Sequence, residues 1–426
     1  MPQSPARIDT AAVARLGDEI LDWRFRSVPD SLFGLTASAA AARQPGLFRD
    51  GFVGPIVALD GPAIEHNLTT MAAWCAERGL LLAPHGKTTM APALFARQLD
   101  LGAWAITAAT AGQLRVYRAF GVSRVLVANE FLDPAGLRWL ARELADPDFE
   151  VVCWVDSVRG VELMTEAWSG ARPLDVLVEV GVPGGRTGVR DEATALAVAA
   201  AVAASPALRL AGVGGYEGPA SSDAGADGLA AVAAYLDRLR ATVFALAGLF
   251  ETDEVIVTAG GSAFFDQVAD ALTGPWPVPV RPVLRCGTYV THDDGFYRDV
   301  SPLGEHPRLH AAAPLRSALR AWAQVVSRPE PGLALLAAGK RDLPYDLGLP
   351  EPRLRRTATG ITPLVGCVVS ALNDQHAYLR GDADLDVGDW VGLGLSHPCT
   401  TFDKWNLLPV TAADGETVTD FLRTFF

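Results

Sequence analysis

Lysine is scarce in this chain of 426 residues, so the residues able to supply a lysine amine are few. Only Lys87, Lys340 and Lys404 are lysines among 36 basic residues. Lys87 lies in the polar run PHGKTT (residues 84–89), directly after a short apolar segment. A lysine amine at the end of a buried strand can form a Schiff base with a carbonyl compound or with pyridoxal phosphate. A surface lysine in a loop is the plainer interpretation, but the scarcity of lysine and the polar neighbours favour chemistry at Lys87.

Two small-residue turns follow later apolar segments and could bind an anion. The first contains Gly260, Gly261 and Ser262, and the second contains Gly287 and Thr288. Glycine lets backbone N–H groups approach a phosphate closely, and a following helix N-terminus favours negative charge. We predict a phosphate site here, although an ordinary turn explains each segment equally well.

Further polar side chains follow other apolar segments. Arg186 lies in a glycine-rich turn, where its planar guanidinium can pair with a phenolate or a carboxylate. Tyr216 and Glu217 are placed to face a bound ring, and Asn129 and Glu130 end another apolar segment. Each of these, taken alone, is also common in loops without catalytic function.

A His-x-Cys pair lies far along the chain, at His397 and Cys399. An imidazole and a thiolate suit Zn²⁺, and two protein ligands leave room for water and substrate, as a catalytic zinc site requires. The segment 292–294 (His-Asp-Asp) offers further ligands or supporting acceptors, but a solvated turn explains it as well.

The elements that position these residues are short apolar strands alternating with amphipathic helices. Alternation of this kind predicts right-handed βαβ units and a parallel sheet. Eight strands over about 210 residues favour a closed (β/α)8 TIM barrel, whose site lies at the C-terminal strand ends. The eight predicted strands are Leu80–Pro84, Ala103–Thr107, Arg124–Ala128, Glu150–Val155, Leu174–Val180, Leu208–Val213, Glu254–Thr258 and Val283–Cys286.

The rest of the chain has a different character. Residues 1–53 are predicted to be an extension with a helix over Ala11–Arg26, and residues 54–300 form the barrel. After residue 300 short β-like segments separated by Gly, Pro and Asp predict an all-β domain over residues 301–426, which carries the His-x-Cys pair. The expected fold class is therefore α/β, a barrel followed by a C-terminal β domain.

Composition excludes several classes of function. The net charge of −13 argues against nucleic acid and anionic membranes as partners. Five cysteines without a C-x-x-C pair do not indicate a disulfide framework, and the N-terminus lacks the apolar core of a signal peptide. We therefore expect a soluble, cytoplasmic protein that acts on a small molecule.

Taken together, these motifs resemble those of the D-serine dehydratase and D-threonine aldolase family, which are fold-type III pyridoxal-phosphate enzymes with the alanine-racemase-like fold. The resemblance covers roughly residues 54–410 and is most specific at the lysine run and at the His-x-Cys pair. It implies pyridoxal 5'-phosphate and Zn²⁺ as cofactors, and a homodimer. The implied roles are the Schiff-base lysine for Lys87, the phenolic-oxygen arginine for Arg186, the residue facing the pyridine ring for Tyr216, the phosphate cradle for Gly260, Gly261, Ser262, Gly287 and Thr288, and the zinc ligands for His397 and Cys399.

The activity implied by the resemblance is deamination of D-serine or a related D-β-hydroxy amino acid to a 2-keto acid and ammonia. Metal-dependent D-threonine aldolase chemistry on the same scaffold is the main alternative. The thiolate of Cys399 favours zinc and dehydration, since Mg²⁺ and Mn²⁺ prefer oxygen ligands. An amino-acid racemase and a non-catalytic pyridoxal-phosphate-binding protein are further, weaker alternatives.

Overall fold

The strands of the protein form two sheets. The computed structural model describes residues 5–310, 312–357 and 359–426. One sheet has eight parallel strands in the order β2-β9-β8-β7-β6-β5-β4-β3. These strands are β2 (Leu81–Leu82), β3 (Ile106–Ala108), β4 (Arg124–Glu130), β5 (Glu150–Val155), β6 (Leu174–Val180), β7 (Leu208–Gly215), β8 (Val255–Ala259) and β9 (Val280–Leu284).

The two strands at the ends of this order, β2 and β3, also meet. A parallel bridge joins His85 and Thr107, just beyond β2 and within β3. The Trp104 amide donates to the Leu82 carbonyl at 2.7 Å, and the Thr107 amide donates to the Pro84 carbonyl at 2.8 Å. The sheet thus curls into a ring, and the predicted barrel is confirmed.

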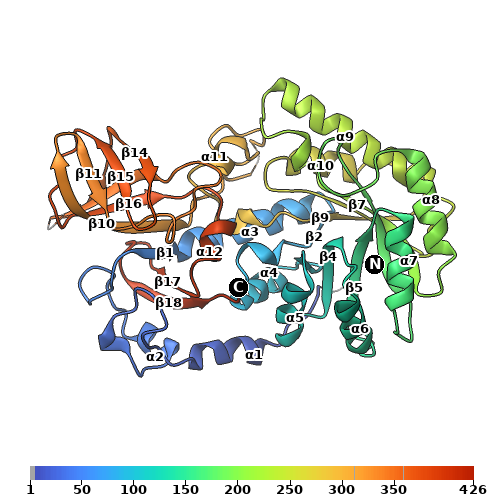
Figure 1. Cartoon of the computed structure of the whole chain (residues 1–426), viewed down its shortest axis with the longest axis horizontal. Helices are drawn as coiled ribbons and strands as arrows, with labels where there is room; N and C mark the ends of the chain where they lie inside the picture. Colours follow the sequence, from blue (N-terminus) through green and yellow to red (C-terminus); the bar gives the residue numbers. More distant parts are fainter. Residues whose placement is uncertain (1–4, 311, 358) are drawn as a thin grey trace.

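Helices follow the strands of the ring and cover its outside (Figure 1). They are α4 (Pro92–Asp100), α5 (Ala111–Ala119), α6 (Pro134–Glu143), α7 (Val158–Ala167), α8 (Glu192–Ala203), α9 (Ala226–Ala245) and α10 (Phe265–Leu272), with α3 (Gly61–Glu77) preceding β2. Several begin with a side chain that accepts a hydrogen bond from a free backbone N–H of the first turn, which fixes where the strand ends and the helix begins. These capping residues are Asp60, Thr110, Asp133, Ser157 and Asp191.

The inside of the ring is filled by apolar side chains. Trp154, Leu177 and Ile256 are buried there, beside other members of one cluster from nearly every strand. Because successive side chains of a strand point to opposite faces, the next inward residue toward each C-terminal end lies above this layer. The C-terminal end of the ring is therefore where polar groups gather.

The second sheet has ten strands and includes one from the N-terminal part of the chain. That strand, β1 (Ile56–Asp60), pairs antiparallel with β10 and parallel with β17, so it joins this sheet rather than the ring (Figure 1). The all-β character predicted after residue 300 is confirmed. The other strands are β10 (Leu319–Glu330), β11 (Leu333–Leu336), β12 (Glu351–Thr357), β13 (Gly360–Pro363), β14 (Cys367–Leu372), β15 (Ala377–Gly381), β16 (Trp390–Gly394), β17 (Leu407–Thr411) and β18 (Val418–Arg423).

Two short helices lie near the junction of the sheets. These are α11 (Phe296–Val300), which follows the last strand of the ring, and α12 (Cys399–Phe402), which lies between β16 and β17 of the second sheet. In Figure 1, α12 lies between the second sheet and the ring, and it contacts the 3₁₀ turn Gly86–Thr88 that follows β2.

The N-terminal helix predicted over Ala11–Arg26 is wrong in its length. The structure has α1 (Thr10–Ala14), then a 3₁₀ turn over Arg15–Asp18, and α2 (Ala37–Ala42) further on. A Cβ on Gly17 in that turn would lie 2.1 Å from the Ser38 hydroxyl, so close packing against α2 decides the local conformation. Among the described residues, no helix is long and apolar enough to cross a membrane.

Candidate active site

A cavity of about 410 Å³ opens at the C-terminal ends of the ring strands. It is bounded by the loops that follow the ring strands and by the start of α12, which lies between β16 and β17 of the second sheet. The ten residues to which the family resemblance assigns roles all line it, while Glu130, Glu217 and the segment 292–294 do not. The group that each of the ten binds stays a prediction. These residues are Lys87, Arg186, Tyr216, Gly260, Gly261, Ser262, Gly287, Thr288, His397 and Cys399.

Lys87 is the only lysine of the chain in this cavity, and it lies half-buried in the turn after β2. Lys340 lies 5.5 Å from the ring centroid of Tyr345, and Lys404 pairs with Asp403 at 3.4 Å. Among the described residues, none makes a hydrogen bond or an ion pair with the Lys87 amine, so this amine is available to react.

Arg285 lies beneath the lysine turn and is almost fully buried, at 1% exposure. Its guanidinium donates to the Thr258 hydroxyl at 2.9 Å, to the Gly215 carbonyl, and to His85 Nε2 at 3.2 Å, and it stacks on Trp154. Because a guanidinium only donates, His85 must accept at Nε2 and carry its proton on Nδ1. Sequence reasoning missed Arg285, although a charged residue within the apolar segment 283–286 was a usable signal.

His85 is therefore held neutral. Burial lowers its pKa well below the usual value, and the positive charges of Arg285 and Lys87 lower it further. Its Nδ1 is buried without a hydrogen-bond partner. The lysine turn thus presents a neutral imidazole with an unused N–H donor.

The glycine turn after β8 is occupied by a side chain of the protein itself. The buried Glu217 carboxylate accepts from the Gly260 amide at 3.0 Å and from the Gly261 amide at 2.6 Å. These two amides were predicted to hold a phosphate, and here they stabilise Glu217 instead. Burial nevertheless raises the pKa of Glu217, and the N–H groups oppose that rise. Ser262, Gly287 and Thr288 also line the cavity, and phosphate binding by these three residues stays a prediction.

Arg186 and Tyr216 form a pair next to this turn, since a Cβ on Gly261 would lie 2.6 Å from the Tyr216 ring. The Arg186 guanidinium carbon lies 4.8 Å from the centroid of the Tyr216 ring, a cation–π distance. Burial and the nearby Glu217 charge raise the pKa of Tyr216 to about 12, so its hydroxyl stays protonated. The pair presents a cation and a hydroxyl donor to the cavity.

His397 and Cys399 enter the cavity from the second sheet's half of the chain. His397 Nδ1 lies 2.5 Å from the Asp346 carboxylate, and the Thr400 hydroxyl donates to the same carboxylate at 2.8 Å. This leaves His397 Nε2 as the ring nitrogen for a ligand. The Cys399 thiol lies 3.4 Å from the Thr88 hydroxyl, which links this loop directly to the lysine turn.

Burial and two neighbouring side chains together set the pKa of His397. Burial alone would lower its pKa, but hydrogen bonding and charge from Cys399, together with Asp346, raise the pKa to about 9. Asp346 was not predicted from the sequence, because it lies 51 residues before His397 with no motif between them.

The segment 292–294 contacts the loop that carries His397 and Cys399. One Asp293 oxygen accepts from the His397 amide at 3.0 Å, and the other accepts from three amides around the start of α11. Asp294 pairs instead with Arg320 at 3.2 Å. Of the two roles considered for this segment, Asp293 has that of a supporting acceptor.

Comparison with known proteins gives the family. A family model described as "Alanine racemase, N-terminal domain" matches residues 59–272, which is half of the chain, and one described as "Putative serine dehydratase domain" matches residues 318–411. The chain belongs to the alanine-racemase-like family. Within it, the chain groups with the fold-type III pyridoxal-phosphate enzymes that include D-serine dehydratases and D-threonine aldolases, as its sequence motifs indicated.

Two relatives of this pyridoxal-phosphate family match over most of the chain. D-threonine aldolase from Arthrobacter sp is 29% identical over 371 residues, which cover 85% of this chain and 89% of the relative. 3-hydroxy-D-aspartate aldolase from Paracoccus denitrificans (strain Pd 1222) is 26% identical over 317 residues, covering 72% and 77%.

Solved structures have the same fold. D-threonine aldolase from Filomicrobium marinum matches with a TM-score of 0.73 and 26% identity over 88% of this chain and 95% of that one. D-threo-3-hydroxyaspartate dehydratase from Delftia sp. HT23 matches with a TM-score of 0.67 and 22% identity over 90% and 99%. Structures of this dehydratase activity include one variant lacking a histidine and another lacking a cysteine two positions later, the latter in a metal-free form.

The residues of the cavity fit pyridoxal phosphate. The volume of about 410 Å³ is within the usual range of small-molecule sites. His85 Nδ1 is a buried donor without a partner, and the Thr288 hydroxyl is buried beside Tyr297 without a well-formed hydrogen bond. Both groups are buried polar atoms that a polar cofactor would satisfy, and the free Lys87 amine lies in the same cavity.

The donor set at the other end of the cavity fits a borderline metal ion. An imidazole whose second nitrogen is held by a carboxylate, next to a thiol, is the arrangement that zinc sites use. Asp346 fixes the ring of His397, and Thr88 adjoins the Cys399 thiol. Two protein ligands leave coordination positions open toward the cavity.

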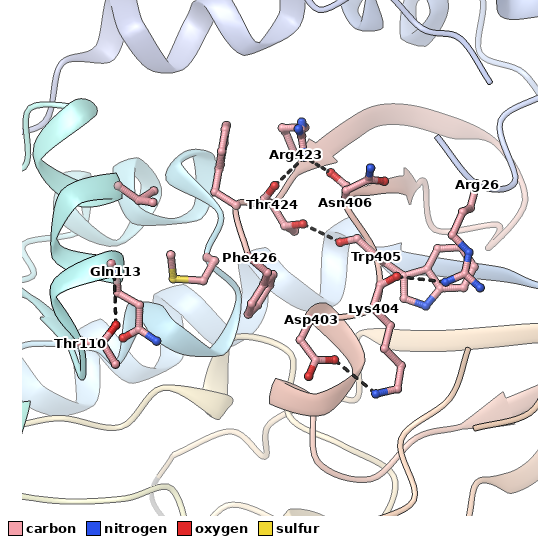
Figure 2. Close-up of a pocket in the computed structure, with 14 residues that line it drawn as sticks. Arg26, Thr110, Gln113, Asp403, Lys404, Trp405, Asn406, Arg423, Thr424 and Phe426 are labelled. Carbon is pink, nitrogen blue, oxygen red and sulfur yellow. Dashed lines mark hydrogen bonds and ion pairs between the residues drawn. The ribbon is translucent and has the colours of Figure 1, made fainter. Parts of the chain in front are cut away.

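A second, larger cavity of about 820 Å³ lies between α5 and the C-terminal residues (Figure 2). None of the predicted site residues lines it. Its charged groups all have partners: Lys404 pairs with Asp403, Arg26 with Asp342, and Arg423 with Glu19. Arg423 also donates to the carbonyls of Asn406 and Thr424 (Figure 2). This cavity therefore offers no reactive group comparable to Lys87.

Proposed function

We propose that the protein is a pyridoxal-phosphate- and zinc-dependent dehydratase that deaminates D-serine or a related D-β-hydroxy amino acid. The observation that carries this proposal is the shared cavity. Lys87 from the ring and the His397–Cys399 pair from the other half of the chain line it together, and the Thr88–Cys399 contact holds the two parts in register.

Lys87 anchors the cofactor in this proposal, and its amine then holds the α-proton of the substrate at Nζ. Bound pyridoxal phosphate supplies an electron sink for the carbanion that remains at the α carbon. Arg186 and Tyr216 bind and orient the ring from one side, while Ser262 and Thr288 bind the phosphate.

The His397–Cys399 pair serves the leaving group. Hydroxide leaves poorly, and a zinc ion held by His397 Nε2 and Cys399 Sγ supplies a Lewis acid for the β-hydroxyl. In the net reaction the substrate loses its α-proton and β-hydroxyl as water, and hydrolysis of the C–N bond by water gives the 2-keto acid and ammonia.

Aldol cleavage of a D-β-hydroxy amino acid is the second candidate. The similarity to D-threonine aldolase from Arthrobacter sp over 85% of this chain favours it. The donor chemistry favours dehydration, because a thiolate selects zinc over Mg²⁺ or Mn²⁺. The dehydratase structures with histidine and cysteine variants also have these two residues two positions apart, as here. A homodimer and a cytoplasmic location stay predictions.

The test is a product analysis with D-serine, D-threonine and D-3-hydroxyaspartate, each with and without a metal chelator. We expect a 2-keto acid and ammonia, lost on chelation and restored by zinc. Glycine and an aldehyde would overturn the dehydratase in favour of the aldolase. An enzyme that forms the L-enantiomer alone would instead support a racemase, and one that forms no product and lacks the absorbance of lysine-bound pyridoxal phosphate would overturn both lyase activities.

A further inference from the structure

Three carboxylates converge at the ends of neighbouring ring strands, outside the cavity described above. Glu130 ends β4, Asp156 directly follows β5, and Glu179 is the penultimate residue of β6. One carboxylate oxygen from each lies within 4.8 Å of the other two. The three residues are brought together by the ring, since they lie 23 to 49 positions apart in the sequence.

Two of these side chains are buried without the partners that a carboxylate needs. Glu179 is 2% exposed, and its Oε2 has no hydrogen-bond partner. Both carboxylate oxygens of Glu130 are likewise buried without a partner. A buried carboxylate without donors is costly, so these oxygens indicate a group that the protein binds between them.

The charge of the cluster points to a cation. Among the residues that the structure describes, no arginine, lysine or histidine makes an ion pair with Glu130, Asp156 or Glu179. Burial, and then the nearby Glu179 carboxylate, raise the pKa of Glu130 to about 8. A single shared proton can bridge at most two oxygens. Three buried oxygens, two on Glu130 and one on Glu179, lack a partner, so a proton alone does not satisfy them. A multivalent cation can contact all three carboxylates at once.

The geometry points to a binding site for one hard divalent cation, such as Mg²⁺, Mn²⁺ or Ca²⁺, held by Glu130, Asp156 and Glu179. Oxygen ligands lie about 2.0–2.6 Å from such ions, so two ligands of one ion are at most about 4–5 Å apart. The 4.8 Å span of the three oxygens is compatible with this distance. The all-oxygen donor set also differs from the His397–Cys399 pair, which suits a softer ion.

The cation site is linked to the loop that carries Arg186. The Asp156 carboxylate accepts a hydrogen bond from the Gly188 amide at 2.9 Å. The Val189 amide donates to the Glu179 backbone carbonyl at 2.7 Å. A cation that fixes Asp156 and Glu179 therefore fixes the segment just after Arg186, at Gly188 and Val189. The role of the ion is to position this loop.

The test is Mn²⁺ binding to the purified full-length protein, measured by electron paramagnetic resonance and by thermal shift. It uses a background variant, His397→Ala/Cys399→Ala, so that the other metal-binding pair cannot contribute. We expect one bound Mn²⁺ per chain and a rise in melting temperature. Adding Glu130→Gln or Glu179→Gln should lower the Mn²⁺ affinity at least tenfold and remove the rise in melting temperature. Glu166→Gln, an exposed glutamate of α7, is the control and should change neither quantity.

The alternatives give different results. If the cluster holds only a proton, the protein shows no stoichiometric Mn²⁺ binding, and its melting temperature falls as the pH rises toward the Glu130 pKa of about 8 and levels off above it, with or without Mn²⁺. This result overturns the proposal. Binding that persists in both Gln variants also overturns it. The Gln variants remove charge repulsion, so we expect them to fold, and circular dichroism in chelator checks this. Neither readout depends on lyase activity, so the proposed function can fail independently.

Discussion

At the residue scale, the two imidazoles of the cavity are each held by a neighbour that binds one ring nitrogen and leaves the other free. Arg285 occupies His85 Nε2 and leaves its Nδ1–H, while Asp346 occupies His397 Nδ1 and leaves Nε2. Lys87 differs, since no described group pairs with its amine. These contacts support the proposed proton transfer at Lys87 and the proposed metal binding by His397 with Cys399.

Replacing Lys87 tests the first assignment. We expect Lys87→Ala to lower kcat by at least about 10²–10⁴-fold, because the amine both moves a proton and anchors the cofactor. Borohydride reduction followed by peptide mass spectrometry should label residue 87 in the native protein and no lysine in the variant. Lys404→Ala, in the larger cavity of Figure 2, is the matched control and should keep label and activity. A label on Lys404 would contradict the assignment.

Replacing Asp346 tests the metal assignment. Asp346→Asn removes the charge that orients His397, and supporting groups of this kind are worth about 10–100-fold in metal affinity. Competition with a zinc chelator measures the change. Asp374→Asn, at an exposed ion pair with Arg341, is the control and should leave zinc affinity unchanged. Equal zinc affinity in the native protein and Asp346→Asn would exclude the proposed role of Asp346.

Many residues that line the cavity could be predicted from the sequence, but Arg285, Tyr297 and the supporting Asp346 were not. Lys87 and the His-x-Cys pair have a local motif. Asp346 supports His397 from 51 positions away, so only the folded chain brings them together. Arg285 and Glu179 did leave a signal, because each is a charge inside an apolar strand segment, where burial demands a partner.

At the element scale, the turn after β6 controls where Arg186 lies. Gly188 has φ +99°, and a Cβ there would lie 2.5 Å from the Gly181 nitrogen, whereas Gly184 has φ +72° and open space around it. We expect Gly188→Ala to lower both stability and pyridoxal-phosphate affinity. Gly184→Ala should cost only about 1–2 kcal/mol of backbone strain and keep cofactor affinity. Denaturant unfolding and cofactor titration distinguish them, and similar cofactor affinities in the two variants would contradict the role of the turn.

The strands of the ring were predictable because buried parallel strands are almost continuously apolar. The polar strand β12 (sequence EPRLRRT) was missed, since it is only partly buried on both faces and lacks an apolar segment. The pairing of β1 with β10 and β17 is set by tertiary contacts that the local sequence pattern does not contain. The N-terminal helix is shorter than predicted for the same reason.

At the scale of the whole molecule, the cavity exists only where the two sheets meet. Cys399 lies in α12, yet its thiol contacts Thr88 in the turn after β2. A zinc ion bound only by the folded protein must therefore stabilise the assembled cavity. At a free concentration of 100 times Kd it should add about 2.7 kcal/mol to the free energy of unfolding.

Thermal unfolding with and without zinc measures this contribution. Cys399→Ala should abolish the zinc-dependent rise in melting temperature, because the remaining imidazole binds zinc weakly. Cys367→Ala, in β14 of the second sheet and outside the cavity, should retain the rise. Loss of the rise in Cys367→Ala, or its retention in Cys399→Ala, would show that the stabilising ion binds elsewhere.

In the proposed reaction, Lys87 and the His397–Cys399 pair perform successive parts of one dehydration. The direct measurement is proton NMR of D-serine in D₂O with metal-stripped protein that retains pyridoxal phosphate, before and after zinc is added. We predict that the α-proton exchanges without zinc, because Lys87 suffices, and that pyruvate and ammonia form only after zinc is added. Pyruvate formed without metal, or glycine and formaldehyde formed with it, would contradict the account.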